Sequence, residues 1–155
     1  MKVSIIQTLD PQRDNSKSKI ASETLLQLLQ NQEIISHMET QAIELEINTL
    51  AQSIQQLCKG NDIIFTIGGT GLGLDDCVPE ASKSIYQREC PGIAELMRSE
   101  TAKINKKAWI SRYTAGIYNN CLIVNFPGKK SSVTECFECA HDIILHTAKM
   151  LCKLK

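Results

Sequence analysis

The sequence carries no net charge and no long hydrophobic run, and both absences narrow what the protein can be. Its 17 basic residues are balanced by 17 acidic residues, so it lacks the positive excess by which proteins hold nucleic acid or an anionic membrane. No apolar run approaches the roughly 20 residues that a membrane-spanning helix needs. The N-terminus shows no signal-peptide pattern. We therefore expect a cytoplasmic protein that binds neither nucleic acid nor a membrane.

Internal repeats, low-complexity tracts and linker-like segments are also missing from the sequence. The chain has 155 residues, of which 43% are hydrophobic and 22% charged. That length and composition suit one soluble domain with a full core. We therefore expect residues 1–155 to form a single domain.

The pattern of a disulfide framework is lacking, although the sequence holds seven cysteines. Their number is odd and their spacing is irregular. Cys136 and Cys139 form a C-x-x-C with His141 and His146 downstream, but no second ligand pair completes a zinc site. We expect reduced thiols that pack as small hydrophobic groups. Cys77 is the one candidate for an exposed and reactive thiol.

What the sequence does contain is an apolar strand followed at once by a glycine-rich, acidic loop. Residues 63–67 are mostly β-branched and predict a buried strand. Four glycines and two acids come next: Gly68, Gly69, Gly71, Gly73, Asp75 and Asp76. Pro79 then suits the first turn of a helix, and Glu80 suits its positive end. α/β proteins bind phosphorylated ligands at such a strand end.

Two common glycine motifs do not fit this loop. A Walker A loop requires Gly-Lys-Ser/Thr, but Gly73 is followed by Leu74 and Asp75. The dinucleotide fingerprint G-x-G-x-x-G starts at Gly69 and Gly71 but has Leu74 at its third glycine. From the glycines alone, an ordinary tight turn remains open.

Predicted strands and helices alternate along the rest of the chain. We expect strands at 2–9, within 33–43, at 63–67, 109–111, 115–118 and 121–125, and helices at 20–29, 50–57, 78–89, 93–104 and from 132 onward. Residues 132–135 have the form of a capping box that opens the last helix. Apolar strands that alternate with helices imply an α/β protein whose mainly parallel sheet is covered on both faces.

Four short motifs occur in a fixed order between Asp62 and Gly128. They are GGTG with a following acid and PEA (68–81), PGIAELMR (91–98), SR with AG (111–116) and LIVNFPG (122–128). This order resembles the MogA/MoaB-like family of molybdopterin adenylyltransferases, which shares its domain with gephyrin-type and MoeA-type proteins. The resemblance implies the three-layer α/β/α molybdopterin-binding fold, commonly as a homotrimer. Before Asp62 the resemblance is thin.

The resemblance also implies a reaction and a set of site residues. In the family, the terminal phosphate of molybdopterin attacks the α-phosphate of ATP with the help of Mg²⁺, and pyrophosphate leaves. Asp76 and Thr70 would be catalytic, and Asp76 would hold magnesium or bind N–H donors of the pterin, an ambiguity that Glu80 shares. The substrate-binding residues would be Gly68, Gly69, Thr70, Gly71, Glu80, Ser111, Pro127 and Gly128.

The sequence departs from the family at the acidic pair. Many members carry an arginine where this chain has Asp75, so the local charge changes by two units. Lys129 and Lys130 could restore positive charge, or could simply be a solvated helix entrance. We expect Glu46, the remnant of a family acidic motif, to be a helix-start acid. We favour the adenylyltransferase, and the alternative is a non-catalytic member that binds pterin or nucleotide or serves as a scaffold.

Overall fold

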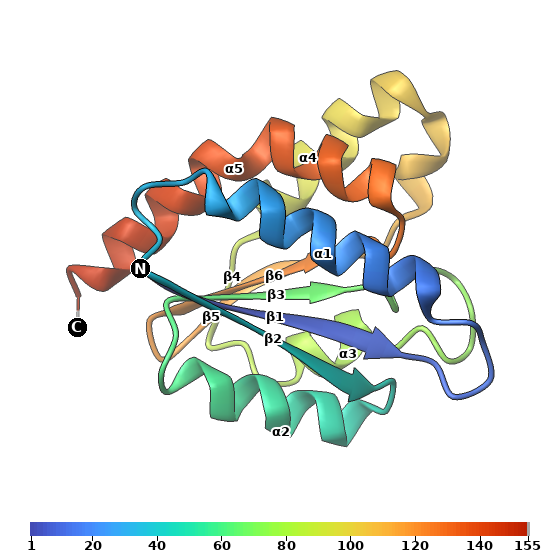
Figure 1. Ribbon diagram of the computed structural model, residues 1–155, viewed down its shortest axis with the longest axis horizontal. Coiled ribbons are helices and arrows are strands. Elements are labelled where there is room, and N and C mark those ends of the chain that lie inside the picture. The colour runs from blue at the N-terminus through green and yellow to red at the C-terminus, as the bar shows by residue number, and fades with distance from the viewer. Residues whose placement is uncertain (155) are drawn as a thin grey trace.

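The computed structural model describes residues 1–154, and within them one six-stranded sheet carries helices on both faces (Figure 1). The strand order is β2-β1-β3-β6-β5-β4. The strands are β1 (Lys2–Leu9), β2 (His37–Glu44), β3 (Ile63–Ile67), β4 (Arg88–Glu89), β5 (Ala115–Tyr118) and β6 (Cys121–Phe126). The first four strands of that order are parallel, β5 is antiparallel to both of its neighbours, and β4 therefore runs in the same direction as the first four. The α/β/α architecture with a mainly parallel sheet is thereby confirmed.

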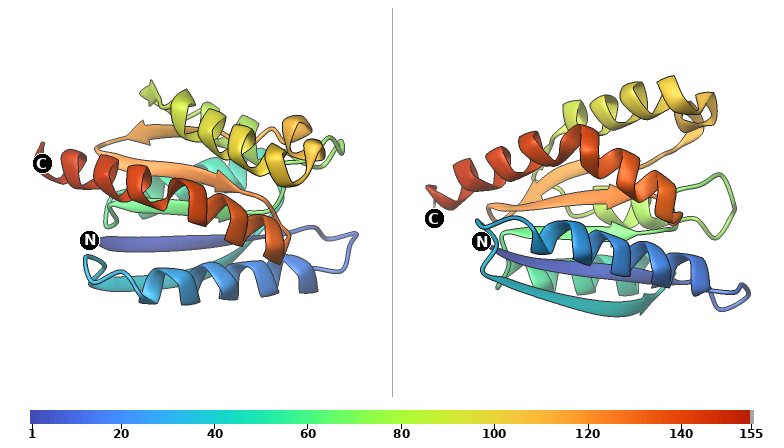
Figure 2. Two further views of the ribbon diagram at one scale, coloured as in Figure 1. Left: turned by 90° about the horizontal axis from the view of Figure 1, so that it is seen from above. Right: turned by 45° about the horizontal axis from the view of Figure 1, so that its top comes forward.

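The helices form two layers that enclose the sheet (Figure 2). One face is covered by α1 (Ser16–Gln30), α4 (Pro91–Ile104) and α5 (Lys130–Cys152), whose apolar residues share one core. The other face is covered by α2 (Ile47–Cys58) and α3 (Val78–Lys83), which share a second core. No helix within residues 1–154 has both the length and the apolar character needed to cross a lipid bilayer.

Strand β3 is the buried centre of the sheet, as its apolar run predicts. All five of its residues are buried. Phe65 and its neighbours at odd positions face the α1/α4/α5 core, whereas Ile64 faces the α2/α3 core. This alternation is the period of two that a strand imposes. The glycine-rich loop therefore leaves from a rigid element.

The long helix α5 also follows its sequence pattern. The six apolar positions expected to point inward are all buried: Val133, Phe137, Ala140, Ile144, Ala148 and Leu151. The start of the helix was predicted wrongly, because α5 begins at Lys130 and residues 132–135 already lie inside its first turns. The amide of Val133 donates to the carbonyl of extended Lys129 at 2.9 Å. The backbone at Lys129 thus begins the helix before the expected capping box.

The predicted helix over residues 78–89 was too long, because α3 ends at Lys83. The chain beyond it pairs with the edge of β5 instead: Gln87 N donates to Ile117 O and Cys90 N donates to Ala115 O, both at 2.9 Å. Pairing with the edge of β5 satisfies these backbone amides, and this favours an extended path over the helix that the local sequence pattern predicts.

Two further local predictions were wrong. Residues 109–111 do not form a strand, because the 3₁₀ helix η1 (Lys106–Ile110) occupies this segment. The Asn105 side chain begins η1 by accepting from Lys107 N at 3.1 Å. Ile20, expected inside, is 48% exposed on α1, on the side that faces Lys129 and Lys130.

The order of the strands fixes where a ligand can bind. After β1 the chain moves outward to β2, and after β3 it moves to the opposite half of the sheet. The carboxyl ends of β1 and β3 therefore lie at the topological switch point, where open α/β sheets bind their ligands. In Figure 1 this is the end of the sheet toward which the arrowheads of β1, β3 and β6 point.

Candidate functional site

A cavity of about 150 Å³ lies at the switch point. It is lined by the loop after β1 and the start of α1, by Leu45 after β2, by the glycine-rich loop after β3, and by Gly128 in the turn after β6. Of the predicted site residues, Gly68, Gly69, Asp76 and Gly128 line this cavity. We call it the switch-point cavity. The structure thus gathers loops that are more than 100 residues apart in the chain around one hollow.

The glycines make the floor of this cavity from bare backbone. Gly68 and Gly69 adopt φ values of +98° and +62°, which favour glycine. A Cβ on Gly68 would stand 2.6 Å from Thr8 Oγ1, and one on Gly69 would stand 2.6 Å from Val78 Cγ2. A Cβ on Gly128 would stand 3.1 Å from the Cα of Gly68. The amide of Gly68 donates to Phe126 O at 3.1 Å, so Gly69 supplies the backbone amide that could bind a phosphate at this floor.

The carboxylate of Asp76 is folded into its own loop. Its Oδ2 accepts a hydrogen bond from Gly73 N at 2.9 Å, and a Cβ on Gly71 would come within 2.7 Å of the same oxygen. No group of three or more His, Cys, Asp or Glu residues that could hold a metal ion exists within residues 1–154. Magnesium is commonly held by one or two carboxylates together with substrate phosphates. Asp76 therefore fits a Mg²⁺ ion that arrives with a nucleotide.

Arg112 is a functional residue that the residue-level predictions missed. Its backbone N donates to Thr70 O at 3.0 Å, and its Nε donates to Gly71 O at 2.7 Å. The two terminal nitrogens donate to Asp76 O and to the carboxylate of Glu80. This one residue thereby holds both ends of the loop formed by residues 68–77, which we call the glycine–acid loop. The signal was present, because Arg112 belongs to the SR motif in the sequence.

Of the remaining loop residues, Thr70 is buried with only 6% of its surface exposed. The side chain of Glu80 is about half exposed and forms its ion pair with Arg112. Both residues thus belong to the wall that shapes the loop.

Two cations that follow β1 were also missed, Arg13 on the loop and Lys17 in the first turn of α1. Arg13 and Lys17 both line the switch-point cavity. Arg13 Nε lies 3.0 Å from Asp10 Oδ2, and its Nη2 lies 3.3 Å from where a Cβ on Gly73 would stand. Lys17 lies with Lys129 and Lys130 around a shallow hollow beside the cavity. These side chains supply positive charge to a loop whose Asp75 is negative.

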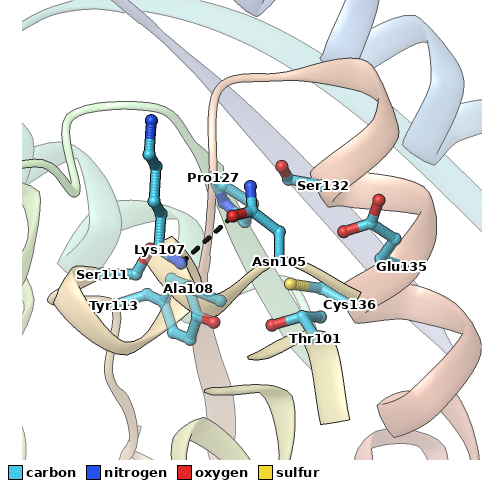
Figure 3. Close-up of a pocket in the computed structure, with 10 residues that line it drawn as sticks. All are labelled: Thr101, Asn105, Lys107, Ala108, Ser111, Tyr113, Pro127, Ser132, Glu135 and Cys136. Atoms are coloured by element: carbon cyan, nitrogen blue, oxygen red, sulfur yellow. Dashed lines mark hydrogen bonds between the residues drawn. The ribbon is translucent and has the colours of Figure 1, made fainter. Parts of the chain in front are cut away.

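Two other predicted residues line a second cavity of about 170 Å³ (Figure 3). Ser111 and Pro127 lie there, with Tyr113 and side chains from α4, η1 and α5. We call it the α4–α5 cavity. The turn at residues 127–128 separates the two cavities, because Pro127 faces one and Gly128 faces the other. The candidate site therefore consists of two adjoining compartments.

Glu46 is the N-cap of α2, as expected for a helix-start acid. Its carboxylate accepts from Asn48 N at 2.9 Å and from Thr49 N at 2.7 Å. These hydrogen bonds lower the pKa of Glu46. Its carboxylate is thus engaged with the start of α2.

The expectation that Cys77 is exposed and reactive was wrong. Its side chain packs into the α2/α3 core and is 9% exposed. Burial, followed by the nearby carboxylates of Glu80 and Glu46, raises the pKa of the Cys77 thiol. A thiol in this environment is a poor nucleophile.

The C-x-x-C cysteines lie on one side of α5. Cys136 packs inside the core as a small hydrophobic group, as expected, and Cys139 Sγ contacts Cys136 O at 3.3 Å. Burial raises the pKa of Cys136 to about 12. Both thiols therefore serve packing.

The parallel sheet, the glycine floor and the surrounding cations define an α/β protein with a site for phosphorylated ligands. Comparison with known sequences identifies the family. Residues 10–146 match the family described as "Probable molybdopterin binding domain". The chain belongs to this family.

Individual relatives agree with this assignment. The molybdopterin adenylyltransferase of Helicobacter pylori strain J99 is 36% identical over 135 residues, which cover 86% of this chain and 73% of that protein. The Escherichia coli K12 molybdopterin adenylyltransferase is 32% identical over 107 residues, which cover 68% of this chain and 55% of that protein. Several curated relatives are thus matched over little more than half of their length.

Solved structures agree on the fold. The molybdopterin biosynthesis enzyme MoaB of Thermus thermophilus superimposes with a TM-score of 0.82 at 26% identity. The superposition covers 97% of this chain and 95% of that chain. The observed architecture is therefore the molybdopterin-binding fold predicted from the four motifs.

Proposed function

We propose that the protein is a molybdopterin adenylyltransferase of molybdenum cofactor biosynthesis, which transfers AMP from ATP to molybdopterin. One observation carries the proposal: the backbone floor at Gly68 and Gly69 lies at the switch point beside Asp76, and Arg112 fixes the loop that follows this floor. Curated relatives with the name molybdopterin adenylyltransferase support it.

The two compartments suit a reaction between two phosphorylated substrates. An oxygen of the molybdopterin phosphate forms a bond to the α-phosphorus of ATP, and the bond to the pyrophosphate oxygen breaks with its electron pair. The amide of Gly69 would bind a phosphate oxygen, with the hydroxyl of Thr70 as a further donor, and Gly68 would shape the floor beside them. Arg13 and Lys17 would offset the negative charge that gathers there.

Asp76 would hold Mg²⁺, which when bound neutralises charge on the phosphates. Gly71 shapes the same loop through its carbonyl contact with Arg112. Glu80 would act mainly by fixing Arg112, and Ser111, Pro127 and Gly128 would line the second substrate's path between the cavities.

A non-catalytic, ligand-binding member of the family is the second candidate. The observation that favours it is Asp75, an acid where many relatives carry an arginine. The cations at Arg13, Lys17 and Lys129 argue against it, because they return positive charge to the site. We therefore prefer the enzyme.

We further propose a homotrimer that works in the cytoplasm. Three large apolar side chains stand in solvent around the end of α4 and η1: Ile104 is 71% exposed, Trp109 60% and Ile110 58%. Exposed apolar clusters of this kind favour association between subunits. No two cysteines within residues 1–154 are joined by a disulfide, which suits a reducing compartment.

A direct assay tests the activity. The purified protein is mixed with Mg²⁺, ATP and molybdopterin, and adenylylated pterin is followed by chromatography. We expect product from the wild type and much less from Asp76→Asn, which keeps the size of the side chain but removes its charge. Saturable molybdopterin binding without product would leave the non-catalytic candidate.

Asp75→Arg separates the two candidates further. If the acid weakens an active enzyme, the arginine should raise turnover, because it restores positive charge beside the phosphates. Asp142→Arg on the exposed surface of α5 is the matched control, with an equal change of charge. Turnover that stays absent in Asp75→Arg would count against the enzyme.

A further inference from the structure

A further cavity, of about 140 Å³, lies outside the two compartments of the candidate site. Its walls come from the end of α3, from β4, from one side of α4, and from residues 112–115, which lead into β5. We call it the β4–α4 cavity. It shares no lining residue with the switch-point cavity and only Tyr113 with the α4–α5 cavity. The proposed reaction therefore leaves this cavity unused.

Positive charge dominates the lining of the β4–α4 cavity. Lys83 borders it from the last turn of α3, Arg98 from α4, and Arg112 from the segment before β5. Glu89 on β4 is the one acidic residue in this lining. Two positive charges are thus left without a negative counterpart in the wall. A hollow lined by an excess of one sign of charge attracts a ligand of the opposite sign.

The cations of this wall keep hydrogen-bond donors that the protein does not use. Arg98 donates through Nη1 alone, to Tyr113 O at 2.8 Å and to Ser111 O at 3.4 Å. Within residues 1–154, Lys83 forms no ion pair. A guanidinium has five N–H donors and an ammonium has three, and neither group can accept a hydrogen bond. A ligand in this cavity would therefore have to be an acceptor.

Both guanidinium groups are fixed in position by the protein itself. The guanidinium carbon of Arg98 lies 5.4 Å from the centre of the Tyr113 ring, so a cation–π contact adds to its hydrogen bond. Arg112 is held through Gly71 O at 2.7 Å and through the carboxylate of Glu80. Groups that are already ordered lose little conformational entropy when a ligand binds.

The size of the cavity limits what it can hold. Pockets for drug-sized ligands measure about 300–1,000 Å³, so a cavity of about 140 Å³ has no room for a nucleotide or a pterin. It does have room for one small ion with a few water molecules. The planar fork of an arginine matches the oxygens of a tetrahedral oxyanion such as phosphate. Size, charge and donor geometry therefore agree on the same class of ligand.

We propose that the β4–α4 cavity binds a small dianionic oxyanion, such as phosphate or sulfate. This site is separate from the substrate compartments and does not depend on the proposed reaction. Arg112 borders the cavity and also holds the glycine–acid loop. An anion bound here would therefore contact the side chain that positions the loop of the candidate site.

Nuclear magnetic resonance can test the site residue by residue. The Nε–H signals of Arg98 and Arg112 and the amide signal of Ala115 are followed as sodium phosphate or sodium sulfate is added, at constant ionic strength and at an alkaline pH where phosphate is dianionic. We expect saturable shifts with both salts, and separate Kd values distinguish the two anions. Nitrate, with a single charge, should bind about tenfold more weakly. The amide of Gly69 reports separately on an anion at the glycine floor.

Three variants test the charges of the wall. Lys83→Gln should weaken phosphate binding by about tenfold, because one charge-assisted hydrogen bond is lost. Glu89→Gln should strengthen binding, because it removes the negative charge of the wall, and a gain in affinity cannot result from unfolding. Lys149→Gln is the matched control, since Lys149 is an exposed lysine in the last turn of α5 as Lys83 is in α3.

The absence of saturable shifts at Arg98 and Ala115 would overturn the proposal. So would equal Kd values for nitrate and the dianions, or an equal loss of affinity in Lys83→Gln and Lys149→Gln. Failure of the protein to adenylylate molybdopterin would instead reject the proposed function and would leave these Kd values interpretable.

Discussion

Arg112 connects more parts of the candidate site than any predicted residue does. Through its backbone and side chain it contacts Thr70, Gly71 and Asp76 of the glycine–acid loop and Glu80 in the first turn of α3. A lysine carries the same charge but cannot fork to several acceptors at once. The loop geometry should therefore depend on the guanidinium shape as well as on its charge.

Arg112→Lys should lower kcat/KM for adenylyl transfer by roughly 10- to 100-fold, because small displacements of a positioning loop are costly. Steady-state kinetics with ATP and molybdopterin measure the effect. Arg88→Lys, at an exposed position on β4, should behave as the wild type. Wild-type kinetics in Arg112→Lys would show that the loop keeps its shape without the three hydrogen bonds of the guanidinium.

At the residue scale, some residues of the candidate site could be predicted from the sequence and others could not. The glycines and Asp76 stand in a compact motif, so their meeting at a strand end could be predicted. Arg13 and Lys17 could not: the family match does begin at residue 10, but no short motif marks these two residues, and their position depends on how the chain after β1 folds back. Nor did Ser111 and Pro127 reveal that they line a separate cavity.

At the scale of elements, α5 and β3 could be predicted because each carries a strong periodic pattern that its burial satisfies. The segment after Lys83 could not. Its sequence has a helical pattern, but the segment forms hydrogen bonds to β5 instead. Because β5 lies about thirty residues further along the chain, the local sequence could not indicate this pairing. Tyr86 secures this segment, because its ring packs directly on Gly116 of β5.

Gly116→Ala tests this contact. The new methyl would stand 2.4 Å from the Tyr86 ring, so the ring or the strand must move. We expect a loss of roughly 1–3 kcal/mol, and a melting temperature lower by about 3–10 °C. Gly92→Ala in α4, where a Cβ would meet no atom within 4 Å, is the control and should not destabilise. Equal stability of the two variants would mean that the Tyr86 ring moves away from the new methyl group without a cost in free energy.

The cap of α2 gives a pH-dependent prediction. Because backbone amides lower the folded-state pKa of Glu46, the carboxylate contributes stability above its unfolded pKa near 4 and loses it as the pH falls through the folded value. Glu46→Gln should therefore melt below the wild type at pH 7, and the gap should close in acid. Melting curves between pH 7 and pH 3 measure it, with Glu23→Gln on α1 as the control. A difference in melting temperature that does not change with pH would argue against a contribution from the charge of Glu46.

At the scale of the whole molecule, a single subunit leaves the apolar cluster of Ile104, Trp109 and Ile110 exposed to solvent. Burial of this cluster against a second subunit would remove the exposed apolar surface. Trp109→Asp should convert the proposed trimer into monomers, because a charge in an apolar interface is not solvated. Sedimentation velocity measures the mass. Met150→Asp, at another exposed apolar position, is the control. A wild type that sediments as a monomer would refute the assembly itself.

The contact between Gly68 and Gly128 limits how this protein could be re-engineered. A Cβ on Gly128 would already press on the Gly68 Cα at 3.1 Å, and one on Gly68 would strike Thr8. Neither position leaves space through which a side chain could be introduced to adjust the floor. Altered ligand preference must therefore be sought at the rim, in the loop after β1 and in residues 129–130. Directed libraries should be placed there, with the floor left untouched.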